Sequence, residues 1–269
     1  MSLGNNIRTL REEKQMTQER LADQLGVSFQ AVSSWEREEY NPDLERLMAM
    51  ARIFDVSLSS LVEEKMDLKT TKAIYDWQHM KTFVKTSAKN LGLSNTLKAL
   101  DFAEKAHEGQ DRKNSDIPYI YHPLNLACHA LAMKIHKDEV IAACLLHDVI
   151  EDCHKQLSDL PVNDETRHLV DLMTHEKDDS RRQQIMEEYY RRLSENPDGA
   201  LIKCLDRCNN LTTMAWGLSR ERIYRMIRET EQYIIPLLKV IKSTAEYNDA
   251  AWLLQYQMES MLDIYKRLL

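Results

Sequence analysis

Apolar residues recur every three or four positions along most of the chain, and this spacing predicts α-helices. In the first part it predicts five short helices, at about 5–14, 18–25, 29–37, from 42–43 through 51, and from 56. After residue 95 it predicts eight more, at about 96–108, 124–135, 138–151, 164–175, 180–194, 198–214, 219–241 and 248–268. Strand signals are absent from this second part, so the chain is predicted to be all-α.

A polar segment divides the two helical parts. We expect a first domain at residues 1–65, a linker at 66–76 and a second domain at 77–269. Apolar Ile74, Trp77, Met80 and Val84 follow at helical spacing, which predicts an amphipathic helix that packs on the second domain or on a dimer partner. Near the C-terminus, Trp252 belongs to another amphipathic helix that either caps the core or pairs subunits.

The second and third predicted helices have clear start and stop signals. Thr17 and Ser28 stand where N-caps are expected, since their hydroxyls can accept a free backbone N–H. Gly26 supplies the left-handed residue that ends the first of the two helices. Two helices joined by so short a glycine-containing turn form a helix-turn-helix.

Composition narrows the class of protein. Hydrophobic residues make up 43% of the 269 residues, with only 6 Gly and 6 Pro, as in a well-packed helical chain. No apolar run is long enough to span a bilayer, and polar residues come too early for a signal peptide. The five cysteines include no CxxC pair and are interpreted as free thiols. We therefore expect a cytoplasmic protein that does not act on membranes.

Charge argues against strong DNA binding by the first domain. Residues 1–65 contain 8 Lys and Arg against 12 Asp and Glu, a net charge of 8 − 12 = −4. Phosphate contacts dominate DNA affinity, so an acidic domain must gather its cations on one face. The residues able to do so are Arg8, Arg11, Lys14, Arg20 and Arg37. The alternative is a helical module that binds protein.

The stretch TQERLADQLGVSFQAVSSWEREEYNPDLERLMAMARIFDVSLSSLV (17–62) resembles the phage-repressor and Cro-type (XRE) DNA-binding family. This resemblance implies that the third helix enters the major groove. The DNA-contacting residues would then be Gln18, Ser28, Gln30, Ser33, Ser34 and Arg37. Gln30 suits bidentate recognition of adenine, and Gln18 suits a phosphate or base edge. Such domains bind paired half-sites, which implies a homodimer on a palindromic operator.

The stretch LLHDVIED (145–152) places four ionisable residues behind an apolar run, which is unusual for a solvated helix end. His122 before a predicted helix and Asp206 within another are the candidate partners of His147 and Asp148. Two His and two Asp suit Mn²⁺, Fe²⁺ or Zn²⁺ better than Ca²⁺. If 138–151 is one helix, Glu151 and Asp152 lie one turn further along the same face, where a carboxylate can orient a water or move its proton.

Three segments resemble the hydrolase domain of the RelA/SpoT homologues and small alarmone hydrolases, within the HD superfamily. They read ALDFAEKAHEGQDRKNSDIPYIYHP (99–123), AACLLHDVIED (142–152) and IKCLDRCNNLTTM (202–214). The resemblance implies Mn²⁺-dependent removal of pyrophosphate from the 3′ position of (p)ppGpp. It implies metal ligands at His122, His147, Asp148 and Asp206, with Glu151 and Asp152 handling the attacking water. It implies nucleotide contacts at Arg112, Lys113, Asn210 and Thr213.

Some positions depart from that family. Asn209 replaces the usual His, Cys208 an apolar residue and Thr212 a basic one, while Cys153 stands where Thr is common. None removes a proposed ligand or acid, but they leave the substrate open among phosphorylated nucleotides. The prediction is a guanosine-nucleotide phosphohydrolase joined to a DNA-binding regulator. The alternative is a repressor whose HD domain senses a nucleotide with little or no turnover.

Overall fold

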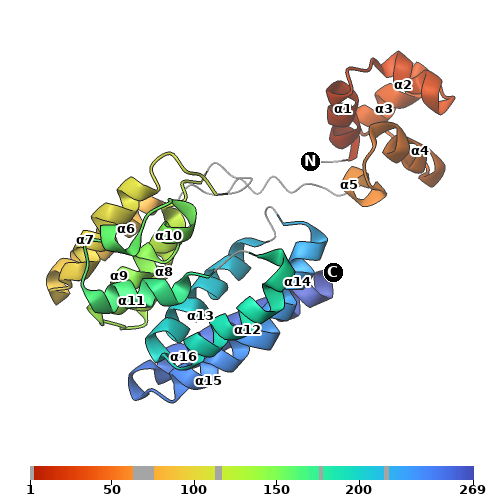
Figure 1. The fold of residues 1–269 in the computed structure, drawn as a ribbon. Helices are drawn as coiled ribbons and strands as arrows, with labels where there is room; N and C mark the ends of the chain where they lie inside the picture. Colours follow the sequence, from red (N-terminus) through yellow and green to blue (C-terminus); the bar gives the residue numbers. More distant parts are fainter. Residues whose placement is uncertain (1–2, 63–75, 113–116, 176–177, 215–217) are drawn as a thin grey trace. The chain divides into compact units, whose positions relative to one another are not determined.

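The computed structural model describes residues 3–62, 76–112, 117–175, 178–214 and 218–269 (Figure 1). Across these ranges the secondary structure is helical and includes no strand, which confirms the all-α prediction. The chain divides into two compact units, Met1–Ile74 and Tyr75–Leu269, and each is described by itself. None of the described helices is long and apolar enough to cross a membrane.

Five helices form the first unit, as the spacing predicted. They are α1 (Leu3–Glu13), α2 (Gln18–Leu25), α3 (Phe29–Glu36), α4 (Leu44–Phe54) and α5 (Leu58–Val62). Their core contains Ile7, Leu21, Val32, Met50 and Phe54, all nearly or fully buried. The helices therefore enclose a hydrophobic core of their own.

Local capping explains the helix-turn-helix. The hydroxyls of Thr17 and Ser28 accept backbone N–H bonds from Arg20 (3.2 Å) and Ala31 (3.3 Å), and so start α2 and α3. Gly26 ends α2 at φ 64°, where a side chain would be strained. These contacts confirm the predicted caps.

The second unit contains eleven α-helices among its described residues. They are α6 (Trp77–Leu91), α7 (Ser94–Ala106), α8 (Tyr121–Ala132), α9 (Asp138–Leu146), α10 (Val149–Asp152), α11 (Asp164–Met173), α12 (Arg182–Ser194), α13 (Pro197–Thr213), α14 (Arg220–Glu229), α15 (Ile235–Lys242) and α16 (Asn248–Leu268). The amphipathic helix expected after the linker is α6, which begins at its N-cap Asp76 and packs against α7 and α8. The part of that expected helix before residue 76 lies outside the described residues.

Helix α9 is the centre of the second unit. Every residue from Val140 to Leu146 is completely buried, because α7, α8, α11 and α13 pack around it. This burial explains the unbroken apolar run ahead of His147. His147, which directly follows its C-terminal end, is consequently buried as well, at 2% exposure.

Two predicted helices are divided in the structure. The prediction of one helix over 138–151 is wrong, since α9 ends at Leu146 and α10 starts at Val149. The predicted helix over 219–241 is interrupted by a π-helical turn, Thr230–Ile234, just before Pro236 in the first turn of α15. Proline has no N–H for the preceding turn, so the backbone rearranges there.

Candidate metal-centred active site

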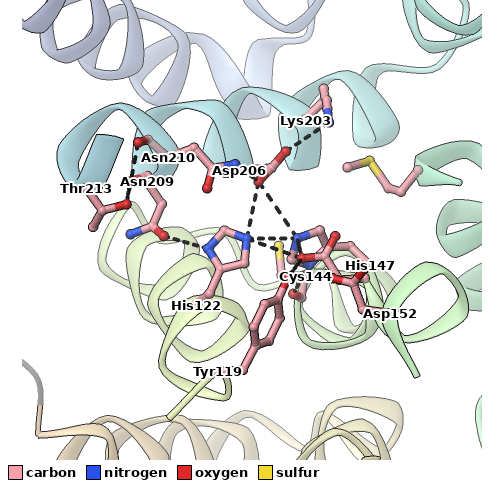
Figure 2. Close-up of polar contacts among 12 residues, drawn as sticks. Tyr119, His122, Cys144, His147, Asp152, Lys203, Asp206, Asn209, Asn210 and Thr213 are labelled. Atoms are coloured by element: carbon pink, nitrogen blue, oxygen red, sulfur yellow. Dashed lines mark hydrogen bonds and ion pairs between the residues drawn. The ribbon is translucent and has the colours of Figure 1, made fainter. Parts of the chain in front are cut away.

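Three helices bring the predicted metal ligands together (Figure 2). His122 lies in the first turn of α8, His147 directly follows α9, and Asp206 lies in the middle of α13. One ligand atom from each lies within 4.8 Å of the others. Asp148 Oδ2 is 3.0 Å from His147 Nε2 and 3.5 Å from His122 Nε2. All four predicted ligands are therefore in one place.

Hydrogen bonds fix both imidazole rings. His122 Nδ1 donates to the side-chain oxygen of Asn209 at 2.6 Å, and His147 Nδ1 donates to the carbonyl of Cys144 at 3.0 Å. Those oxygens only accept, so each Nδ1 carries a proton, and in the neutral form of each ring the Nε2 lone pair faces the centre. The two Nε2 atoms are 3.2 Å apart, beside Asp206 Oδ1. Such converging acceptors fit a cation between them, and the nitrogen and oxygen donor set suits a divalent transition metal.

Helix α13 also supplies the groups that hold Asp206. Lys203 Nζ donates to Asp206 Oδ2 at 2.9 Å, and Asn210 Nδ2 donates to Oδ1 at 2.6 Å. The ammonium of Lys203 also lies 5.5 Å from the centre of the Tyr189 ring. The sequence interpretation missed Lys203 and the orienting role of Asn209. Their positions three residues either side of Asp206 on one helix were the available signal.

The charges of the centre favour a cation. Burial by itself lowers the pKa of His147, but Asp148 and Asp206 outweigh burial and raise that pKa to about 9. Burial raises the pKa of Asp148, but His147 outweighs it and holds the pKa below its usual range. Burial likewise raises the pKa of Asp206, but Lys203 and the two histidines hold it well below the usual value. The site therefore stabilises positive charge between its acidic residues.

The two candidate acids of α10 have different partners. The phenol oxygen of Tyr119 lies 2.7 Å from Asp148 Oδ2 and 2.8 Å from Asp152 Oδ2, so it joins Asp152 to the centre. Burial, followed by these two carboxylates, raises the pKa of Tyr119 far above its usual value and keeps the phenol protonated. Glu151 Oε1 instead accepts the backbone N–H of His175 at 3.1 Å. The two acids are adjacent in α10, and their carboxylates have different partners: Asp152 contacts Tyr119 and Glu151 accepts from the His175 N–H.

Three predicted nucleotide contacts adjoin the centre. Arg112 Nη2 donates to Asn210 Oδ1 at 3.2 Å and to Thr213 Oγ1 at 3.4 Å. Asn210 in turn bonds Asp206, so this group continues directly from the metal centre along α13. The fourth predicted contact, Lys113, lies outside the described residues.

The predicted DNA-contacting residues have mixed surroundings in the first unit. Ser28, Gln30 and Arg37 are exposed, while Ser33 and Ser34 are half-buried. The guanidinium of Arg37 bonds the carboxylate of Glu39 and the hydroxyl of Ser33. Of the predicted DNA-contacting residues, those exposed at the start of α3 are therefore its N-cap Ser28 and Gln30.

One buried carboxylate holds two residues that were expected to face DNA. Gln18 donates to Glu36 Oε2 at 2.7 Å. Arg11 is buried and bonds both oxygens of Glu36, at 2.6 and 3.1 Å. The expectation that Arg11 faces DNA is wrong, because it holds α1 against α3 inside the unit.

Fold and site define an all-α protein that combines a helix-turn-helix unit with a second unit in which a His, a His-Asp pair and an Asp form a candidate metal site. Comparison with known families agrees: an HD domain model matches residues 99–234, and a helix-turn-helix model matches residues 7–61. The chain belongs to the HD domain family, with an XRE-type helix-turn-helix at its N-terminus.

Curated relatives match the two units separately. The chain is 30% identical to a guanosine-3′,5′-bis(diphosphate) 3′-pyrophosphohydrolase of Aquifex aeolicus over 145 residues, 52% of this chain and 20% of the relative. It is 34% identical to the enzyme of that name from Vibrio cholerae over 143 residues, 50% and 20% respectively. It is 32% identical to the immunity repressor protein of Bacillus phage phi105 over 85 residues, 32% and 59%. The chain thus spans about a fifth of the length of these enzymes.

Proposed function

We propose that this protein is a metal-dependent nucleotide phosphohydrolase that removes pyrophosphate from the 3′ position of (p)ppGpp, and that the same chain binds DNA as a transcriptional regulator. The observation that carries the proposal is the continuous path from Asp206 through Asn210 to Arg112. It places a guanidinium and two polar side chains next to a cation centre. A substrate with several phosphates requires positive charge in that position.

His122, His147, Asp148 and Asp206 would hold the cofactor, which we propose to be Mn²⁺ or another divalent transition metal. When bound, this ion would supply Lewis-acid polarisation of the phosphoryl group under attack. Asn209 and the Cys144 carbonyl keep the two imidazoles in the tautomer that ligation requires. Lys203 holds the carboxylate of Asp206 ionised and in place.

The remaining residues have roles in binding and proton transfer. Arg112 would bind the substrate phosphates while Asn210 and Thr213 orient its guanidinium. Asp152 would orient the attacking water or accept its proton, because its contact with Tyr119 fixes the carboxylate beside the centre. Glu151 would contribute a negative charge near the centre, and it would hold the backbone at His175 by accepting its N–H.

For the first unit we propose sequence-specific DNA binding, with α3 in the major groove and Gln30 reading a base. Two copies would occupy a palindromic operator as a homodimer. The similarity to a phage immunity repressor and the exposure of Ser28 and Gln30 support this assignment. In this proposal residues 1–65 bind DNA, 66–76 connect the units and 77–269 hydrolyse the nucleotide.

One observation favours a second candidate, a repressor that senses the nucleotide with little turnover. Glu151, a predicted water-handling acid, is engaged with His175, whose ring Nδ1 lies 3.2 Å from its carboxylate. A sensor would bind the nucleotide through Arg112 and the metal without requiring Glu151 as a base.

The deciding experiment is incubation of the full chain with Mn²⁺ and, separately, ppGpp, GTP, GDP and NADPH, scoring pyrophosphate and phosphate. Pyrophosphate from ppGpp alone, abolished by Asp206→Asn, supports the hydrolase. Binding of ppGpp by calorimetry without multiple turnover supports the sensor. Turnover of another nucleotide with ppGpp untouched refutes the alarmone assignment. Retention of the ppGpp rate in Asp206→Asn refutes the site.

A further inference from the structure

Helix α14 presents a basic side to solvent. Ile227 is buried and Ile223 and Met226 are partly buried, so these three side chains hold the helix on the core of its unit. The outward side carries four exposed arginines: Arg220, Arg222, Arg225 and Arg228. Glu221 is the one exposed carboxylate among them, and it lies in the first turn. The exposed residues of α14 therefore carry a net charge of 4 − 1 = +3.

The arginines are spread over this outward side. At about 100° per residue, Arg225 and Arg228 lie about 60° apart near its middle, while Arg220 and Arg222 lie on its two flanks. Tyr224 is 45% exposed and lies about 40° from Arg228 round the helix. Like charges on neighbouring turns of a helix repel one another. The arrangement is therefore unfavourable unless an anion neutralises it.

These four guanidiniums have no ion-pair partner among the residues that the structure describes. Elsewhere in the second unit, seven arginines are paired with carboxylates: Arg167, Arg181, Arg182, Arg191, Arg192, Arg207 and Arg267. The side chain of Arg191 is 55% exposed and still contacts both Glu188 and Glu195. Exposure alone therefore does not explain the unpaired arginines of α14, whose charge is available to an external anion.

The first unit has few cations to offer a nucleic acid. Its seven described cations include four that are already in ion pairs: Arg8, Arg11, Arg37 and Arg46. The three others, Lys14, Arg20 and Arg52, have no ion-pair partner among the described residues. Contacts between cationic side chains and phosphates supply a large share of the affinity of proteins for DNA. A chain that binds DNA through this unit would gain affinity from phosphate contacts made elsewhere.

We propose that α14 is a further DNA-binding surface, on which Arg225 and Arg228 contact the phosphate backbone of duplex DNA. Arg220 and Arg222 flank this contact. It carries no base recognition, because phosphate contacts hold no direct sequence information. The inference deepens the DNA binding proposed above and rests on it for the choice of duplex DNA over RNA, since the same chain has a helix-turn-helix. The surface itself is inferred from the charges of α14.

The first test is binding of the full chain to a random-sequence DNA duplex, measured by fluorescence anisotropy at rising salt concentration. Each neutralised phosphate contributes about 0.9 to the slope of log K against log salt. Arg225→Gln/Arg228→Gln should therefore lower the slope by about 1.8 and raise the Kd. The matched control is Arg191→Gln/Arg267→Gln, which removes the same charge from exposed, ion-paired arginines and should keep the parent slope. Both variants should unfold near the temperature of the parent, because the substituted side chains are exposed.

Gln30→Ala separates this inference from base reading by the first unit. It should keep the parent affinity for the random-sequence duplex, even where it weakens binding to a preferred sequence. A parent chain without any preferred sequence, whose slope still falls in the α14 variant, would refute the first-unit assignment and retain α14. A parent chain that binds no random-sequence duplex, or an α14 variant with the parent slope, would overturn the α14 proposal even if a preferred sequence is bound.

Two further measurements exclude other anions on α14. The KM for ppGpp should be unchanged in the α14 variant, and a raised KM with an unchanged DNA slope would assign these arginines to the nucleotide. Random-sequence single-stranded RNA should bind more weakly than the duplex. Tighter binding of that RNA, lost in the α14 variant, would overturn the assignment of this surface to duplex DNA.

Discussion

Asn209 offers the sharpest test of how the metal centre is built. Its side-chain oxygen is the only acceptor among the described residues for the Nδ1 proton of His122, at 2.6 Å, and both residues are buried, at 3% and 2% exposure. Asn209→Leu keeps a similar volume and removes that acceptor. A buried N–H left without a partner costs about 1–3 kcal/mol. Part of that cost is avoided if the ring turns, but Nε2 then no longer faces the centre.

To bind the metal, Nε2 must face the centre, and the Nδ1 N–H is then left without a partner. We therefore take this cost as the loss of free energy of metal binding. With about 1.4 kcal/mol for each tenfold change, 1–3 kcal/mol corresponds to roughly 5- to 140-fold weaker binding. This range agrees with the ~10- to 100-fold loss of metal affinity expected when the hydrogen-bond partner of a metal-ligating histidine is removed. We therefore expect the Kd for Mn²⁺ to rise about 10- to 100-fold in Asn209→Leu.

The assay is Mn²⁺ titration of the full chain by calorimetry, with thermal unfolding of the metal-free protein measured separately. Asn209→Asp restores an acceptor oxygen and should recover affinity near that of the parent. Thr212→Ala is the matched control, because Thr212 is exposed on α13 and its hydroxyl bonds only the Asn209 carbonyl among the described contacts. Parent-like Mn²⁺ affinity in a folded Asn209→Leu variant would refute the orienting role.

Four further substitutions test the rest of the proposal. Asp148→Ala should lose metal and hydrolysis together, measured by metal analysis and pyrophosphate release; turnover without bound metal would contradict the ligand assignment. Asp152→Asn should retain Mn²⁺ while kcat falls ~100-fold, because Asp152 is the proposed proton acceptor, and an unchanged kcat would remove Asp152 from that role. Arg112→Ala should raise KM about 10- to 100-fold, the equivalent of one or two charge-assisted hydrogen bonds, and equal KM values would exclude phosphate binding there. Gln30→Ala should weaken operator binding by about 1–3 kcal/mol in a mobility-shift titration and leave hydrolysis intact; undiminished affinity would exclude base reading by this residue.

Local signals account for the parts of the fold that the sequence predicted well. Thr17, Ser28 and Gly26 act within three or four residues of their own positions, so their effect on α2 and α3 can be inferred without tertiary contacts. The buried run of α9 is similarly visible as an uninterrupted apolar segment. The four proposed metal ligands were predicted from their resemblance to a known family, and the structure brings all four side chains together.

Contacts between distant residues account for what was missed. Arg11 and Glu36 are 25 residues apart, and nothing near Arg11 shows that a buried carboxylate faces it. A cation on an amphipathic helix was therefore assigned to the surface. Tyr119 was missed for the same reason, because its two carboxylate partners come from a segment about 30 residues further along. Contacts of this kind between polar groups far apart in the sequence follow from packing and not from helical spacing.

The break between α9 and α10 changes the directions in which the ionisable side chains of the LLHDVIED stretch (145–152) point. On a continuous helix, Glu151 and Asp152 would follow His147 and Asp148 by one turn and share their face. At Asp148 the backbone departs from helical geometry, with φ −100° and ψ −6°, and its carboxylate turns towards the imidazole of His147.

Asp152 then remains joined to the centre through Tyr119, while Glu151 is turned to the backbone of His175. The two acids are thus not equivalent. A glutamine at 151 keeps an oxygen for the His175 N–H and removes only the charge, whereas an alanine removes both. Comparing those two variants separates the electrostatic contribution of Glu151 from its hold on this segment.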